Sequence, residues 1–152
     1  MDKSDPPRNF GVFKPTGHTI AALPDAKQAD AAIEQLRQAG IDGADVTRYT
    51  AAEMAAQAEA DITQGSSVAG VGQELNLVKL HRQLALDGCH FVVVRTRDSA
   101  QVERVADVAR ACGALTAQHY GLLIITELIE NKSGAAQVFE SPDRGLDSKY
   151  NN

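Results

Sequence analysis

The sequence contains one pattern twice, in residues 25–49 and 98–120, and this repeat constrains the fold more than any other feature. Each copy begins with Asp-x-x-Gln, continues through an arginine and a glycine, and ends at a tyrosine. An apolar run precedes each copy, residues 18–23 in the first and 89–94 in the second. Asp followed three residues later by Gln is typical of a helix start, so each copy predicts a strand followed by a helix.

Apolar residues within each copy follow the i, i+3, i+4, i+7 spacing of a helix that packs one face on a core. They are Ala29, Ala32, Ile33 and Leu36 in the first copy and Val102, Val105, Ala106 and Ala109 in the second. Gly40 and Gly113 follow these stripes, where a helix C-terminus favours a residue that tolerates positive φ. Residues 44–49 and 115–120 then complete each unit as a second strand.

Two βαβ units of this size predict an α+β fold with a ferredoxin-like sheet in the order 4-1-3-2. The two repeat halves are residues 18–49 and 89–120. A minimal flavodoxin-like sheet is the rival topology, although it normally needs more strands. The apolar residues 121–129 are expected to supply an extra C-terminal strand.

The insertion between the halves, residues 50–88, is predicted to be helical. A capping box at Thr50 and Glu53 starts one helix, and a second helix runs on to Asp87. The stretch GSSVAGVG (65–72) between them invites a phosphate-loop interpretation. It lacks the Gly-Lys-Ser/Thr ending and follows no predicted strand, so a hinge between two helices is the favoured reading.

A chain of 152 residues is expected to form a single domain, spanning residues 17–129. Residues 1–16 contain three prolines and predict an extended N-terminal arm. Residues 130–152 are polar and without periodicity, and predict a flexible tail.

Charge and composition exclude several classes of protein. The net charge is −5, which argues against nonspecific binding of nucleic acid. No long apolar run is present and residues 1–10 lack a hydrophobic signal core, so a cytoplasmic protein without a membrane segment is expected. Cys89 and Cys112 lack CxxC spacing and are predicted to be reduced core residues.

Several segments resemble a known family. They are FKPTGHTIAALPD, TRYTAAEM, GQELNLVKLHRQLALDG and the closing GALTAQHYG. Their arrangement over residues 17–128 resembles the general stress protein 17M-like domain family, small bacterial proteins linked to stress responses by association. The resemblance implies a class of protein and supplies no catalytic residues.

Histidines at strand ends are the first candidates for a site. If the central strands of the sheet run parallel, His18 and His90 begin neighbouring strands at one edge, and the return strands bring further residues back to it. Those residues are Arg48, Tyr49, His119 and Tyr120. His18, His90 and His119 could then hold a transition metal, or the tyrosines and Arg48 could frame an anionic ligand. The alternative is that these histidines are simply half-exposed at polar strand ends.

The second candidate pair is Glu74 and His81, which lie seven residues apart and therefore on one face of a predicted helix. This spacing would let both approach a common ligand. The alternative is a packed histidine and an acidic residue favoured by the helix dipole.

Oligomerisation is suggested by the run Val92, Val93 and Val94, because consecutive strand residues point to both faces of a sheet. In a two-layer fold one of these faces would be in water, so it must be covered by the inserted helices or by a second copy. Residues 121–129 could also add an edge strand to a neighbour. A homodimer is expected.

Two hypotheses about function remain from the sequence. The first is a non-enzymatic, stress-associated binding or interaction module of unknown ligand, which recruits a partner through the 50–88 insertion or the tail. The second is a small dimeric α+β enzyme, or a metal- or haem-binding protein, that uses His18, His81 or His119. The absence of triad, paired-carboxylate and dinucleotide motifs favours the first.

Overall fold

The structure of the protein, a computed structural model, describes residues 1–9, 11–65 and 72–130. Within them the main sheet contains the strands β3 (His18–Leu23), β4 (Val46–Tyr49), β5 (His90–Arg95), β6 (Thr116–Tyr120) and β7 (Ile125–Ile129). The helices are α1 (Ala26–Gln38), α2 (Ala51–Gly65), α3 (Gly72–Leu86) and α4 (Ser99–Ala111), with a short 3₁₀ turn at Gly43–Asp45. The fold class is α+β, as the repeat predicts.

The sheet has the order β4-β5-β3-β6-β7, and every neighbouring pair is antiparallel. It differs from the predicted four-stranded 4-1-3-2 sheet by a fifth strand, because β7 pairs with β6 of the same chain. The prediction of an extra C-terminal strand is therefore confirmed. The central strands β3 and β5 were expected to run parallel, and this is wrong. β5 lies between the two strands of the first unit and runs opposite to both of them.

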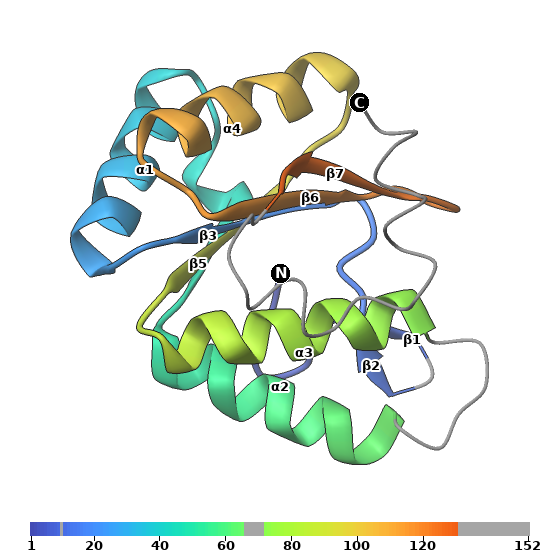
Figure 1. The fold of residues 1–152 in the computed structure, drawn as a ribbon. Coiled ribbons are helices and arrows are strands. Elements are labelled where there is room, and N and C mark those ends of the chain that lie inside the picture. Colours follow the sequence, from blue (N-terminus) through green and yellow to red (C-terminus); the bar gives the residue numbers. More distant parts are fainter. Residues whose placement is uncertain (10, 66–71, 131–152) are drawn as a thin grey trace.

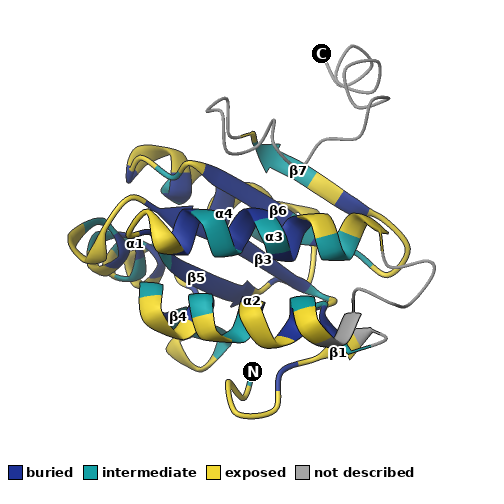
Figure 2. Cartoon of the chain, turned by 60° about the horizontal axis from the view of Figure 1, so that its bottom comes forward, coloured by how far each residue is buried: buried dark blue, intermediate teal, exposed yellow. Residues whose placement is uncertain are grey.

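Helices cover both faces of the sheet, which gives three layers (Figure 1). The repeat helices α1 and α4 lie on one face, and the inserted helices α2 and α3 lie on the other. Val92 and Val94 belong to the core under α1 and α4, whereas Val93 belongs to the core under α2 and α3. The inserted helices thus cover the second face within one chain, and β3 is buried along its whole length between the two helical layers (Figure 2).

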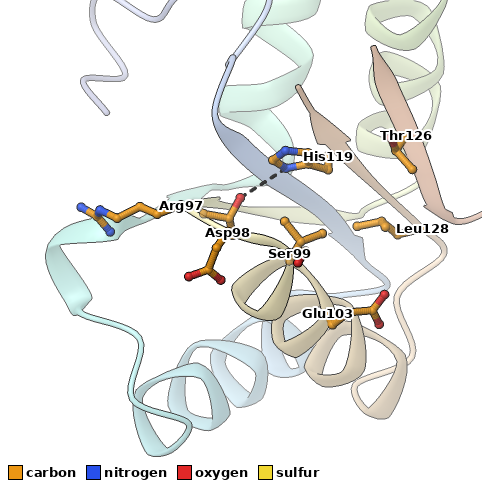
Figure 3. Close-up of a pocket in the computed structure, with 9 residues that line it drawn as sticks. Arg97, Asp98, Ser99, Glu103, His119, Thr126 and Leu128 are labelled. Atoms are coloured by element: carbon orange, nitrogen blue, oxygen red, sulfur yellow. Dashed lines mark hydrogen bonds between the residues drawn. The ribbon is translucent and has the colours of Figure 1, made fainter. Parts of the chain in front are cut away.

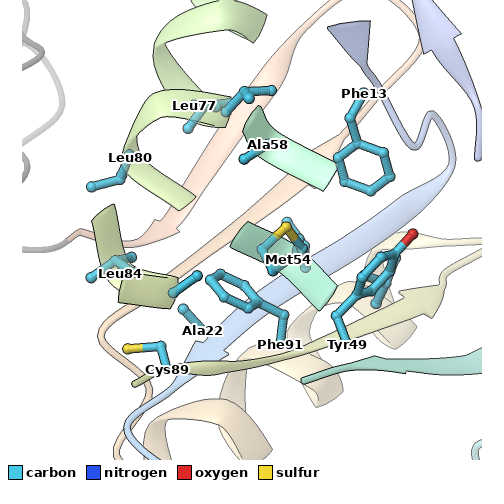
Figure 4. Packing of buried hydrophobic residues seen from close by; sticks show 14 of the residues in the cluster. Phe13, Ala22, Tyr49, Met54, Ala58, Leu77, Leu80, Leu84, Cys89 and Phe91 are labelled. Atoms are coloured by element: carbon cyan, nitrogen blue, oxygen red, sulfur yellow. The ribbon is translucent and has the colours of Figure 1, made fainter. Parts of the chain in front are cut away.

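The core under α2 and α3 contains the larger side chains (Figure 4). Met54 and Leu84 project from the two helices towards Phe91 of β5, and Tyr49 of β4 packs edge-on against Phe13 with ring centroids 6.1 Å apart. The core under α1 and α4 is built mostly from alanine and valine. Both cysteines are buried and unpaired, and burial raises the pKa of Cys89 to about 11.

The local signals in the repeat are borne out by the helix ends. Asp25 accepts a hydrogen bond from the Gln28 amide, and Asp98 accepts one from the Gln101 amide, each at 2.8 Å. Gly40 and Gly113 have φ of +89° and +77° after their helices. These values lie in the left-handed region, where a residue without Cβ avoids a steric cost.

The capping box predicted at the start of the insertion is also present. The Glu53 amide donates to Thr50 Oγ1 at 3.1 Å, and the Thr50 amide donates to Glu53 Oε1 at 2.9 Å. These two bonds satisfy otherwise unpaired donors at the start of α2.

Residues 1–9 and 11–16 do not form a simple extended arm. They contain the paired strands β1 (Arg8–Asn9) and β2 (Val12–Phe13), and both β2 side chains are in the core under α2 and α3. The buried carboxylate of Asp61 on α2 accepts a hydrogen bond from the Phe13 amide at 3.1 Å and two from the Gln57 side chain. This carboxylate therefore fastens the N-terminal strand to the inserted helix.

Replacing Asp61 by alanine should lower the free energy of unfolding by about 1–3 kcal/mol, because the buried Phe13 amide loses its acceptor. Urea denaturation measures this change. The control is Glu59→Ala on the same helix, whose partner Arg82 is at the surface. It should cost about 1 kcal/mol or less. Equal losses in the two variants would contradict the anchoring role of Asp61.

Candidate functional site

The antiparallel pairing of β3 and β5 separates the strand-end histidines. His18 lies opposite Arg95, whereas His90 lies opposite Leu23 at the other end of β3. Five residues of extended chain separate these positions, or about 17 Å along the strand. The predicted gathering at one end is therefore wrong for His90, whereas His18 and His119 do lie at the same end. No group of three or more potential metal ligands occurs among the described residues.

At the His90 end of the sheet, Arg48 is held by other protein groups. Its guanidinium pairs with Asp30, donates to the Ala26 carbonyl at 3.1 Å, and lies 3.4 Å from His90 Nδ1. Tyr49 points to the opposite face and is buried. Arg48 and the two tyrosines consequently do not frame an anion site, because Tyr120 lies opposite His18 at the other end.

His18 is buried at its end of the sheet, and its Nδ1 lies 3.0 Å from the Thr16 carbonyl. Its pKa is lowered, chiefly by burial. Tyr120 is buried in the core under α2 and α3, and the pKa of its hydroxyl is raised by burial. Both residues are buried, so His18 is not the half-exposed strand-end histidine of the alternative interpretation.

His119 is the strand-end histidine that opens into a pocket. The pocket has a volume of about 360 Å³ and lies on the α1/α4 face, between the start of α4 and the strands β6 and β7. Its lining comprises Thr96, Arg97, Asp98, Ser99, Val102, Glu103, His119, Thr126 and Leu128. Figure 3 shows His119 and Glu103 at opposite ends of the labelled set, with Ser99 and Leu128 between them.

The orientation of the His119 ring is fixed by two hydroxyl groups. Its Nδ1 lies 3.1 Å from Thr19 Oγ1 and 3.3 Å from Thr96 Oγ1, and the two hydroxyls are 3.0 Å apart. A hydroxyl both donates and accepts, so this pair satisfies Nδ1 in either tautomer. Within the described part of the chain Nε2 has no hydrogen-bond partner, which leaves it for a ligand. Burial lowers the pKa of His119 and favours the neutral ring.

Two of the charged side chains in the lining are already engaged. Arg97 forms hydrogen bonds of 2.6 and 3.2 Å with the carboxylate of Asp45, and these bonds hold the pKa of Asp45 below its usual value. Asp98 caps α4 through the Gln101 amide. Glu103, by contrast, has no charge or hydrogen-bond partner among the residues described.

Glu74 and His81 do not share a ligand. The Glu74 carboxylate forms an ion pair with Lys14 at 3.2 Å, whereas His81 is 1% exposed between α3 and the sheet. His81 Nε2 lies 3.2 Å from Gln118 Oε1, and its ring packs edge-on against Phe91 at 5.4 Å. Burial lowers the pKa of His81 to about 4. This histidine is a neutral core residue.

The sequence indicated His119 as a candidate but not the residues that surround it. Thr19 and Thr96 carry no pattern of their own, and their contact with His119 depends on β3 lying between β5 and β6. The Asp98 helix start was recognised, although only as a cap. Helical spacing could have shown that Ser99 and Glu103, four residues apart on α4, lie on one side of the helix that begins at Asp98.

The phosphate-loop interpretation concerned residues 65–72, of which 66–71 lie outside the described residues. None of the described helices has the length and apolar character needed to cross a membrane. No family model matches the chain, and neither does any curated protein or solved structure. The resemblance to the general stress protein family stays a prediction.

His81 predicts a defined dependence of stability on pH. Its pKa is about 4 in the folded protein and about 6.5 when exposed, so the unfolded chain binds the proton first as the pH falls. The free energy of unfolding should therefore decrease from pH 6.5 to 4, by about 2–3 kcal/mol through this residue. Because glutamine is always neutral, His81→Gln should remove this part of the decrease.

Urea denaturation at pH 7.0 and pH 4.5 measures the difference. The same decrease in wild type and His81→Gln would show that His81 is protonated in the folded state.

Proposed function

We propose that the protein is a non-enzymatic binding module whose ligand site is the His119 pocket. The observation that carries this proposal is the anchored imidazole. Two hydroxyls hold Nδ1, and Nε2 is left without a partner among the described residues. A pocket with a few oriented polar groups and an apolar wall is typical of small-molecule sites, and Val102 and Leu128 supply that wall.

The partners of His119 favour binding over catalysis. A histidine that acts as a general base is commonly oriented by a carboxylate, which stabilises the imidazolium formed during the reaction. His119 is oriented by threonine hydroxyls instead, and burial lowers its pKa. The alternative of an enzyme, or of a metal or haem protein, relies on His18, His81 or His119. His18 and His119 lie at the same end of the sheet, but His90 lies at the other end and His81 is buried in the core.

A role in stress responses rests on the resemblance of residues 17–128 to the general stress protein 17M-like family. We also infer that the main sheet is a ferredoxin-like sheet extended by β7. This inference is supported by the order of β6, β3, β5 and β4 and by the position of both repeat helices on one face. Recruitment of a protein through the insertion 50–88 stays a prediction.

A homodimer is part of the proposal, with a different surface from the one that the sequence suggested. The inserted helices cover the second face of the sheet, so that face does not require a second copy. The turn between β6 and β7 instead exposes Leu122, Leu123 and Ile124 to 80%, 90% and 72%. Contiguous exposed apolar side chains of this kind are typical of interaction sites.

Native mass spectrometry of protein purified without denaturation tests the ligand site. We expect a retained small-molecule mass in the wild type that is lost in His119→Ala. His90→Ala is the matched control, because His90 lies at the other end of the sheet, and it should keep the mass. A mass that survives His119→Ala, or an empty protein in every sample, would sink the proposal. Turnover of the retained compound would instead favour an enzyme.

Light scattering coupled to size-exclusion chromatography tests the dimer. The wild type should elute with twice the mass of one chain, and Leu123→Ser should shift it to the monomer because it replaces the most exposed apolar side chain of the turn. Leu86→Ser, at an exposed leucine on α3, should leave the mass unchanged. A monomeric wild type at tens of micromolar would contradict the prediction.

A further inference from the structure

The chemistry of the His119 pocket restricts the ligand that it can hold, provided that the pocket is the binding site proposed above. Its lining contains three formally charged side chains, Arg97, Asp98 and Glu103. Arg97 is committed to Asp45, and Asp98 is committed to the first turn of α4. Glu103, which is exposed, is the charged side chain of the lining that neither an ion pair nor a helix start engages, and the lining keeps a negative balance because capping does not neutralise Asp98.

Glu103 follows Ser99 by four residues on α4, so both lie on the same side of the helix. Figure 3 shows the Glu103 side chain at the far end of the pocket from His119. No described residue forms an ion pair or hydrogen bond with this carboxylate. A carboxylate without a partner at one end of a pocket is complementary to an ammonium group.

Uncharged hydrogen-bonding groups occupy the rest of the pocket. His119 Nε2 lies at one end, and the hydroxyls of Ser99 and Thr126 lie on α4 and β7. These hydroxyls also lack a partner among the described residues. A neutral imidazole beside two hydroxyls suits an alcohol or amine group of the ligand, because each of them both donates and accepts.

We propose that the pocket binds a small organic cation, with its ammonium group at Glu103 and a hydroxyl or amine group at His119. The distance across the pocket is bridged by a short carbon chain that lies on Val102 and Leu128. An amino alcohol has this arrangement of groups. The pocket would therefore contact the ligand through polar groups at both ends and through apolar side chains in the middle.

An anion is the competing ligand, because the start of a helix attracts negative charge. In α4 that position is already taken by the Asp98 carboxylate, which accepts the Gln101 amide at 2.8 Å. Arg97, the nearest cation of the lining, is neutralised by Asp45. An anion would therefore meet Glu103 without a free cation from the lining to offset the repulsion.

Three compounds of similar size and different charge separate these ligands: ethanolamine, ethylene glycol and glycolate. Each is titrated into ¹⁵N-labelled protein, including the imidazole nitrogens, while the nitrogen and amide signals are followed by NMR. Ethanolamine should shift the His119 ring signals and the amides around Glu103 with millimolar affinity, because so few atoms contribute to binding. Ethylene glycol should bind more weakly, and glycolate should not bind.

Two variants and one control assign the contacts. Glu103→Gln should weaken ethanolamine binding about threefold to fivefold, the loss expected for a solvent-screened ion pair, and should not weaken that of ethylene glycol. His119→Gln should weaken both. Asp107→Asn, an exposed acid one turn further along α4 that pairs with Arg110, should change neither.

The outcomes separate the two proposals. Binding of glycolate or ethylene glycol that equals or exceeds that of ethanolamine, and that depends on His119, would overturn the cation proposal and leave the pocket as the site. Ethanolamine shifts that are unchanged in both Glu103→Gln and His119→Gln would place its binding elsewhere and overturn the cation proposal. Absence of any shift with ethanolamine would overturn the cation proposal, whereas the retained mass in native spectra would still report on the pocket.

Discussion

The antiparallel position of β3 between β5 and β6 determines most of what this molecule can do. Each residue of β3 has a partner on β5, and all but Leu23 also have one on β6, so β3 lies inside the sheet. Its side chains alternate between the two helical layers. Thr19 faces α4, and Ile20 faces the inserted helices. A shift of one residue would exchange these faces and bury polar groups in both cores. The pairing therefore fixes the core and the pocket together.

The His119 pocket is a direct product of this register. Thr19 comes from β3, Thr96 follows β5, and His119 belongs to β6, so three neighbouring strands deliver the three groups to one point. The imidazole is held by hydroxyls that are themselves buried by the sheet. Such an arrangement orients the imidazole without adding a charge. Because the hydroxyls can donate to or accept from Nδ1, either tautomer of His119 is possible, and the group that binds at Nε2 would determine which one forms.

The repeat was sufficient to predict the local structure of the domain. Asp25 and Asp98 cap their helices because a carboxylate there satisfies an unpaired amide, and this depends on residues three positions apart. The glycines after both helices follow the same local logic. The capping box at Thr50 and Glu53 predicted the start of α2 correctly, because it too depends on residues three positions apart. Signals of this kind need no knowledge of the tertiary structure.

The direction of the central strands could not be derived in this way. The apolar runs at 18–23 and 89–94 are compatible with either parallel or antiparallel strands. The assumption of parallel strands placed His90 beside His18, whereas it lies at the opposite end of β3. The contact of His81 with Gln118 was equally hidden, because it joins a helix to a strand 37 residues away. The partners of His119 come from residues with no pattern, so the candidate could be named but its site could not be described.

The anchoring of Phe13 by Asp61 also has a consequence for the order in which the molecule is made. The two residues are 48 positions apart, so the strand that contains Val12 and Phe13 leaves the ribosome well before its acceptor on α2. These two side chains, which end up fully buried, remain in solvent until the insertion has been synthesised. A nascent chain stalled between these points would expose an apolar segment that lies between Pro7 and Pro15. Transiently exposed apolar surface of this kind makes a partly folded chain prone to aggregation.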